Sequence, residues 1–228
     1  MREGNEGSDH LIRNLERTSP ENSIFNYKSG RKAFLLLGQG NIHEWLETLL
    51  PNTRLILEPK IIGSGIGIQY INGALSKAID ENSHDITESV RAIKYIPKNI
   101  SIKKRIEIRG VLYAEEKLSN KNNENDFIGI QNSKPKIKIH RFCALQIFHC
   151  NINHFQSLVE LKHLNFEIPQ TQFTKCISDI EIYLQCWKEG KLFKSDPTSG
   201  LVLKINSRKL QKHLGENSLS MHWAYEIN

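Results

Sequence analysis

The segment "EPKIIG", residues 58–63, places a lysine between a carboxylate and a glycine at the end of an apolar run. A lysine amine attacks an electrophilic phosphorus or carbonyl centre when it is neutral, and it then forms a covalent intermediate. Lys60 is flanked by Glu58 two residues before it and by Gly63 three residues after it. A lysine on an exposed strand surface would need no such frame, so the frame favours a nucleophile at Lys60.

A second group of residues whose side chains could take part in catalysis or binding lies further along the chain. Lys204 ends the run "SGLVLK", and Arg109 stands in the alternating segment "RIEIRG". For Lys204, a structural and a catalytic role are equally compatible with the pattern. "GSGIGI", residues 63–68, leads into an alternating segment and no helix, which disfavours a dinucleotide-binding turn and favours close backbone approach beneath a pocket.

Alternating apolar segments predict strands around these residues. "LILEPKI", "GIGIQYI" and "GALSKAI" predict an antiparallel meander around Lys60, with Asn72 and Gly73 as the hairpin turn. Further strands are predicted in "RIEIRGVLYA", "KIKIHRFCALQIFHC", "SGLVLKI" and "MHWAYEIN". Helices are predicted in "IHEWLETLL", "FQSLVELKHLN" and "SDIEIYLQCWKEGKLF", the last with Ser178 or Asp179 as N-cap, and "DITESVRAIKYIP" predicts a helix or a turn-rich crossover.

Strands with helices inserted between them predict the α+β class. Residues 1–32 are polar and predict a partly disordered arm with one short helix over 9–17, and residues 33–228 predict one domain. Within that domain, residues 115–135 predict a polar loop.

The composition excludes several classes of protein. The chain has 228 residues, 39% of them hydrophobic and 25% charged, which is ordinary for a globular protein and unlike collagen. No apolar run has the length of a membrane span, and the polar start lacks a secretory signal, so we expect a cytoplasmic protein without a membrane partner. The four cysteines form no CxxC pair, which predicts neither a zinc site nor a thiol redox motif.

A net charge of +6 is compatible with a polyanionic partner such as nucleic acid. "KPKIKIHR" sets Lys134, Lys136 and Lys138 on one face of a predicted strand, as a row that could follow a phosphate backbone. A solvated strand face that discourages edge pairing explains the same row equally well. Few aromatic residues lie nearby, which disfavours binding of single-stranded nucleic acid by stacking.

The order of these segments resembles the adenylation domain of bacterial NAD-dependent DNA ligases. "EPKIIG", "HDITESVRAIKYIP", "IEIRG", "LKHLNFEIPQTQFTKC" and "SGLVLKI" follow one another as the family patterns E-P-K-x-D-G, E-D-V-T-x-N-V-R-T-I-x-x-I-P, E-V-R-G-E, a Leu-Gly-Phe-Val turn and D-G-V-V-x-K-V do. The resemblance covers about residues 55–228. It implies a nucleotidyltransferase fold with antiparallel sheets around a nucleotide cleft.

The resemblance also implies roles for individual residues. Lys60 would attack the α-phosphate of NAD and become a lysyl-adenylate, and Lys204 would lie beside the same phosphate. Glu58 would accept a hydrogen bond from the adenine amino group. The remaining residues of the implied nucleotide site are Ile61 and Val202 flanking the ring, Phe148 stacking on it, and Arg109. Ordinary core packing would explain the apolar members of this set as well.

Several charged positions of the family are substituted in this chain. Ile62, Val111 and Ser199 stand where the family patterns carry carboxylates, and Glu226 stands where the terminal pattern W-A-x-A-Y-K-F carries a catalytic lysine. Fewer carboxylates mean fewer oxygen ligands for Mg²⁺, so we expect no metal site from the sequence and consider Mg²⁺ binding doubtful. Asp80, Glu81 and Asp85 are candidates to replace the missing carboxylates.

Three functions remain open at this point. The first is a stand-alone domain that still binds an adenine nucleotide (NAD, ATP or AMP) but has lost or nearly lost ligase activity. The second is an active NAD- or ATP-dependent adenylyltransferase or DNA ligase that forms lysyl-AMP on Lys60, with groups supplied by a partner. The third is a basic scaffold that binds DNA or a DNA-repair protein. An adenylate adduct on Lys60 would separate the second function from the other two.

Overall fold

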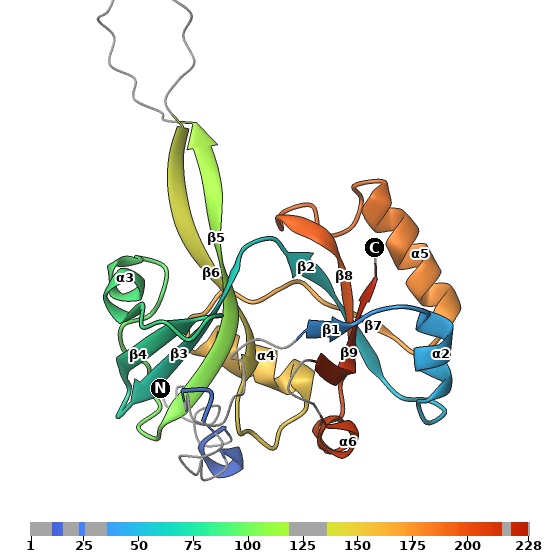
Figure 1. The fold of residues 1–228 in the computed structure, drawn as a ribbon, viewed down its shortest axis with the longest axis horizontal. Coiled ribbons are helices and arrows are strands. Elements are labelled where there is room, and N and C mark those ends of the chain that lie inside the picture. The colour runs from blue at the N-terminus through green and yellow to red at the C-terminus, as the bar shows by residue number, and fades with distance from the viewer. Residues whose placement is uncertain (1–10, 16–22, 26–35, 119–135, 216–219, 228) are drawn as a thin grey trace, which may run out of the picture.

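The strands of the computed structural model form two sheets that lie side by side (Figure 1). The structure describes residues 11–15, 23–25, 36–118, 136–215 and 220–227. Within these residues the first sheet has the order β1-β9-β8-β2-β7, with β1 Leu36–Gly38, β2 Leu55–Ile61, β7 Gln172–Thr174, β8 Thr198–Ile205 and β9 Ser220–Ile227. The second has the order β4-β3-β5-β6, with β3 Ser64–Ile71, β4 Ala74–Asp80, β5 Ile106–Leu118 and β6 Lys136–Ile147.

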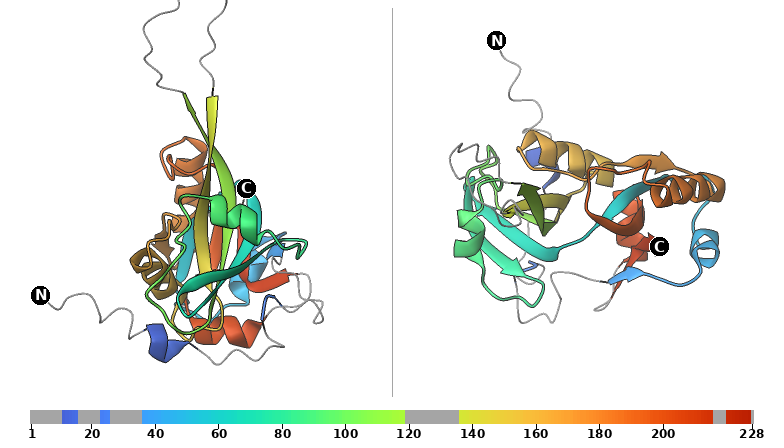
Figure 2. Two further views of the ribbon diagram at one scale, coloured as in Figure 1. Left: turned by 90° about the vertical axis from the view of Figure 1, so that its left-hand side faces the viewer. Right: turned by 90° about the horizontal axis from the view of Figure 1, so that it is seen from above.

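The predicted meander around Lys60 is wrong in one respect. β3 and β4 pair antiparallel through the predicted turn, where Asn72 and Gly73 have φ of 52° and 83°. β2, however, pairs with β8 and β7 in the other sheet, and β3 pairs with β5. The chain therefore crosses from one sheet to the other directly after Lys60, between β2 and β3 (Figure 2). Alternation of apolar residues predicts a strand but does not specify its neighbour.

Helices pack on the outer faces of the two sheets (Figure 1). They are α2 Ile42–Glu47, α3 Thr87–Ala92, α4 His154–His163, α5 Ile177–Lys188 and α6 Arg208–Leu214. α6 was not predicted from the sequence. The N-cap of α5 is Cys176 and neither Ser178 nor Asp179, because the helix begins earlier than predicted.

Each sheet has its own hydrophobic core. One core lies between the four-stranded sheet and helix α4, and the other joins the five-stranded sheet to α2 and α5. A small cluster of Ile61, Tyr113 and Cys143 connects the two sheets. The residues on either side of this cluster are therefore held by both sheets at once.

The hairpin of β5 and β6 projects beyond the sheet (Figure 1). Their pairing runs from Ile108 opposite Ile147 to Leu118 opposite Lys136. The predicted polar loop over 115–135 is thus too long, because residues 115–118 belong to β5. Residues 119–135 lie outside the described part of the chain.

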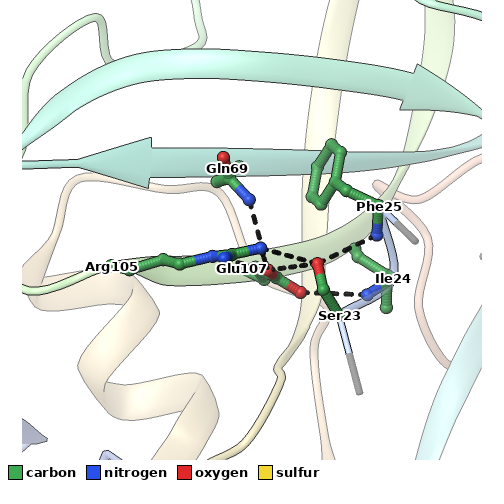
Figure 3. Close-up of polar contacts among 6 residues, drawn as sticks. All are labelled: Ser23, Ile24, Phe25, Gln69, Arg105 and Glu107. Atoms are coloured by element: carbon green, nitrogen blue, oxygen red, sulfur yellow. Dashed lines mark hydrogen bonds and ion pairs between the residues drawn. The ribbon is translucent and has the colours of Figure 1, made fainter. Parts of the chain in front are cut away.

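Two parts of the predicted N-terminal arm pack against the domain. Residues 11–14 are helical, and Leu11 is fully buried in the core beneath the four-stranded sheet. Further along, Ser23 and Ile24 lie on the opposite face of that sheet and bind the carboxylate of Glu107 (Figure 3). The rest of the predicted arm lies outside the described residues.

Glu107 is the centre of this contact. Its Oε1 accepts hydrogen bonds from Ser23 Oγ at 2.7 Å, from Gln69 Nε2 at 3.2 Å and from Arg105 at 2.6 and 3.0 Å. Its Oε2 accepts the backbone N–H of Ile24 at 3.1 Å. A buried carboxylate with this many donors is fully compensated for the loss of water. The contact fixes the arm next to strand β5, which also carries Arg109.

We expect Ser23→Ala to lower the free energy of unfolding by about 1–2 kcal/mol, because Glu107 would lose a buried donor. Urea denaturation followed by circular dichroism measures the change. Ser178→Ala, at an exposed serine in α5, is the matched control and should change stability by less than about 0.5 kcal/mol. Equal stability of the Ser23 and Ser178 variants would show that the hydrogen bond between Ser23 and Glu107 does not stabilise the fold.

Candidate functional site

A cavity of about 190 Å³ lies between the two sheets. β2, β8, β9 and β1 of the five-stranded sheet form one wall, and β5 and β6 of the other sheet form the opposite wall. The residues that line it are Leu37, Glu58, Pro59, Lys60, Ile61, Arg109, Val111, Leu145, Gln146, Val202, Lys204, Met221 and Trp223. The structure therefore brings Glu58, Lys60, Ile61, Arg109, Val202 and Lys204, all of them predicted site residues, to one cavity.

A buried ionic cluster lies on the five-stranded side of this cavity. Lys204 Nζ lies 2.7 Å from Glu58 Oε2, and His154 Nε2 lies 2.5 Å from Glu58 Oε1. β2 and β8 place the first two residues as neighbours, since Glu58 pairs with Val202 and Ile56 pairs with Lys204. His154 comes from the first turn of α4. All three side chains are buried.

The charge states of this cluster follow from its surroundings. Burial has the largest influence on Glu58 and alone would raise its pKa, but Lys204 and His154 act against it and lower the pKa to about 2. Burial lowers the pKa of His154, although Glu58 opposes the shift. Glu58 is therefore ionised and can only accept, so neutral His154 donates its Nε2–H to it. A carboxylate has lone pairs to spare beyond these two bonds, and the cluster can still accept a donor from a ligand.

Acid should destabilise the protein in two ranges of pH. In the unfolded chain His154 binds a proton near pH 6.5, whereas in the folded protein its lowered pKa keeps it neutral, so stability falls as the pH drops below 6.5. Glu58 adds stability above pH 4.5 that is lost as the pH falls from 4.5 towards 2. Urea denaturation between pH 4.5 and 6.5 isolates the first range. His154→Gln should flatten the pH dependence there, and exposed His213→Gln should leave it unchanged. An unchanged slope in His154→Gln would contradict this assignment.

The predicted nucleophile forms an ion pair at the mouth of the cavity. Lys60 Nζ contacts Oε1 of Glu226, whose Oε2 accepts a hydrogen bond of 3.1 Å from Gln39 Nε2. The Glu226 side chain is 6% exposed and the Lys60 side chain 36% exposed. β9 carries Glu226 to this place because it pairs with β8, with Glu226 opposite Val202. A carboxylate therefore lies against the amine of Lys60.

The structure does not bring Phe148 into the wall of the cavity. The guanidinium of Arg109 lies over its ring at 4.4 Å, and Arg109 Nη1 lies 3.3 Å from the sulfur of Met221. Phe148 follows the end of β6 and donates its backbone N–H to the carbonyl of Glu107. Arg109 thus occupies the cavity side of Phe148, where the predicted stacking would require the base.

The substituted positions lie around Lys60. Ile62 is 55% exposed, Val111 lines the cavity, and Ser199 is exposed at the start of β8. The candidate replacements Asp80 and Asp85 do not line the cavity. Asp80 binds His84 and Asp85 binds Thr87, both at the turn between β4 and α3.

The described residues contain no group of three or more His, Cys, Asp or Glu side chains that could hold a metal ion. They also contain no helix long and apolar enough to cross a membrane. All four cysteines are free thiols, and burial raises the pKa of the Cys143 thiol beside the cavity.

The predicted basic row is only partly described. Lys134 lies outside the described residues, whereas the backbone of Lys136 and Lys138 belongs to β6, opposite Leu118 and Glu116.

Sequence reasoning missed several residues of the cavity. His154, which contacts Glu58 but does not line the cavity, belongs to helix α4 of the core on the four-stranded sheet, and nothing in its local sequence separates it from other polar residues at a helix start. Leu37 and Leu145 look like ordinary core residues. The remaining missed residues are Gln146, Met221 and Trp223.

Comparison with known proteins identifies relatives of this chain. The sequence model of the NAD-dependent DNA ligase adenylation domain matches residues 39–227. A DNA ligase from Mycoplasma capricolum subsp. capricolum is 30% identical over 226 residues, which cover 83% of this chain and 34% of the ligase. A DNA ligase from Prochlorococcus marinus strain NATL2A is 29% identical, with 76% of this chain and 31% of the ligase covered. The chain spans about a third of the length of these relatives.

The similarity of the chain to solved structures is lower in sequence identity. The ATP-dependent DNA ligase from bacteriophage T7 in complex with ATP gives a TM-score of 0.46 at 11% identity, covering 85% of this chain and 67% of that one. A Lig E DNA ligase gives 0.48 at 13% identity, covering 85% and 68%.

Proposed function

Because this chain belongs to the NAD-dependent DNA ligase adenylation domain family, we propose that it recognises adenine in the cavity between its sheets and does not carry AMP on Lys60. The observation that carries this proposal is the ion pair of Lys60 with Glu226. The family resemblance puts a catalytic lysine at position 226, so the substitution replaces a cation by an anion at the nucleophile. The domain is then a binding module that has lost the adenylation reaction.

The Lys60–Glu226 pair acts against phosphoryl chemistry in two ways. A nucleotide phosphate and the Glu226 carboxylate would compete for the same amine, and their like charges repel one another. Catalysis of phosphoryl transfer depends on cations placed where negative charge develops. Ile62, Val111 and Ser199 remove further charged groups near this point. Removing one electrostatic group commonly costs about 10²–10³ in rate.

The remainder of the cavity supports recognition of a base. Its walls are mainly apolar, with Ile61, Val111, Leu145 and Val202 facing the space. Apolar walls with a few placed polar groups are typical of small-molecule sites. Glu58 is one of the polar groups that line this space, and its ionised carboxylate can accept an amino hydrogen. Such a group favours adenine over a purine that carries a carbonyl in place of the adenine amino group.

Two assays test the proposal together. The first incubates the protein with nicked duplex DNA, Mg²⁺ and either NAD or ATP, and the expected result is no joined product. The second titrates adenosine by calorimetry, and the expected result is saturable binding that Leu145→Trp abolishes by filling the cavity. Circular dichroism confirms that this variant is folded. Joining of the nick would contradict the loss of chemistry, and the absence of any adenine binding would contradict the recognition.

A second candidate function is an active adenylyltransferase. The same observation favours it, since the Glu226 carboxylate could take the place of the carboxylate that the family has at position 62. It predicts that Lys60 becomes adenylated and that Glu226→Ala loses the adduct. The proposed function predicts that neither the wild-type protein nor Glu226→Ala forms the adenylate adduct.

A further inference from the structure

The charges around the cavity restrict which ligands it can bind. Resting on the proposed function, we infer that the cavity takes an adenine nucleoside that lacks a 5′-phosphate, and that Glu226 excludes the phosphorylated forms. Glu226 is then a specificity-determining residue as well as the partner of Lys60.

Two of the cations that line the cavity are already matched by carboxylates. Lys204 Nζ lies 2.7 Å from Glu58 Oε2, and Lys60 Nζ contacts Glu226 Oε1. Each pair has no net charge, so neither offers a phosphate an uncompensated cation. A phosphate that took over either lysine would leave a buried carboxylate without its cation, which is strongly unfavourable.

Glu226 is held firmly in this position. It lies within β9, opposite Val202 of β8, so its backbone is fixed by the sheet. Gln39 Nε2 binds its second oxygen at 3.1 Å, and its side chain is 6% exposed. The carboxylate cannot turn into water without breaking both contacts. A 5′-phosphate placed near Lys60 would therefore meet a fixed negative charge.

The size and polarity of the space agree with a small neutral ligand. The cavity of about 190 Å³ lies below the roughly 300–1,000 Å³ of most ligand pockets. Val111, Leu145, Met221 and Trp223 give it apolar walls that suit a base. A dinucleotide such as NAD adds a second phosphate and a second nucleoside, which this small space does not match in size.

Calorimetric titration with adenosine, AMP, ATP and NAD at one ionic strength tests the inference. We expect adenosine to bind more tightly than AMP, and ATP and NAD to bind more weakly than both. Trp223 lines the cavity, so quenching of its fluorescence gives a second readout when the heat of binding is small. Glu226→Gln keeps the shape and removes the charge, and we expect it to raise the affinity for AMP at least about tenfold while leaving adenosine nearly unchanged.

Glu181→Gln, at an exposed position of α5, is the matched control and should leave all four affinities unchanged. AMP binding as tight as adenosine binding, or tighter, would overturn the inference and leave the proposed adenine recognition intact. A Glu226→Gln variant with unchanged AMP affinity would also overturn it. If neither heat nor fluorescence reports binding of any of the four compounds, the proposed function itself is wrong.

Discussion

Lys204→Met should lower the free energy of unfolding at pH 7 by about 3–5 kcal/mol, one of the two largest effects that we expect from a single substitution in this chain. Methionine keeps most of the length of the side chain but removes the charge that lies 2.7 Å from Glu58 Oε2. The Glu58 carboxylate, which is 1% exposed, would then remain ionised against a neutral histidine alone. Urea denaturation measures the loss.

Lys191→Met is the matched control for this prediction. Lys191 also forms an ion pair, with Glu189, but its side chain is 68% exposed, so the variant should lose less than about 1 kcal/mol. Combining Lys204→Met with Glu58→Leu removes both charges and should restore much of the stability. If Lys204→Met is as stable as Lys191→Met, the buried pair does not hold the two strands together.

Gly110→Ala should cost at least about 3 kcal/mol or abolish the cooperative unfolding transition. A Cβ atom at Gly110 would lie 2.3 Å from the carbonyl oxygen of Cys143 and 2.4 Å from Cε2 of Phe142. Both obstacles belong to the neighbouring strand β6, and Phe142 is buried, so neither can move aside easily. Thermal and urea denaturation report the loss.

Gly190→Ala separates this steric effect from backbone strain. Gly190 has a φ of +65°, but a Cβ atom there would meet nothing within 4 Å. Its substitution should cost about 1–2 kcal/mol through the left-handed backbone alone. A Gly110→Ala variant that is no less stable than Gly190→Ala would show that β5 and β6 can separate at this point.

The sequence predicted most strands and the longer helices because their apolar residues repeat with a regular period. β2, β3 and β8 were recognisable from alternation or from continuous apolar runs. The pairing of these strands was not, since β2 could join either sheet without changing its own pattern of burial. The three-residue strands β1 and β7 are too short to have a period at all.

The candidate site was predicted in part for a similar reason. Glu58, Lys60 and Lys204 stand in motifs, so their sequence context singled them out. The contact of Lys60 with Glu226 depends on the order β9-β8-β2, which joins residues 166 positions apart. His154 lies 96 positions from Glu58, and only the packing of α4 brings it there. A local sequence pattern does not specify contacts between residues that lie so far apart along the chain.

The position of Phe148 shows a limit of carrying a role over from a family resemblance. The resemblance implied that Phe148 stacks on the base. Its backbone N–H binds Glu107, and the Arg109 guanidinium covers its ring. The position of one side chain on a neighbouring strand therefore changes what an aromatic residue can contact.

Intact-mass spectrometry of the purified protein after incubation with NAD, and separately with ATP, in the presence of Mg²⁺ tests the loss of chemistry at Lys60 most directly. We predict that both samples keep the mass calculated for the unmodified chain, and that Lys60→Ala likewise shows no increase over its own calculated mass. An increase equal to one AMP that is absent from Lys60→Ala would contradict the account, because it would show that Lys60 attacks a nucleotide despite its contact with Glu226.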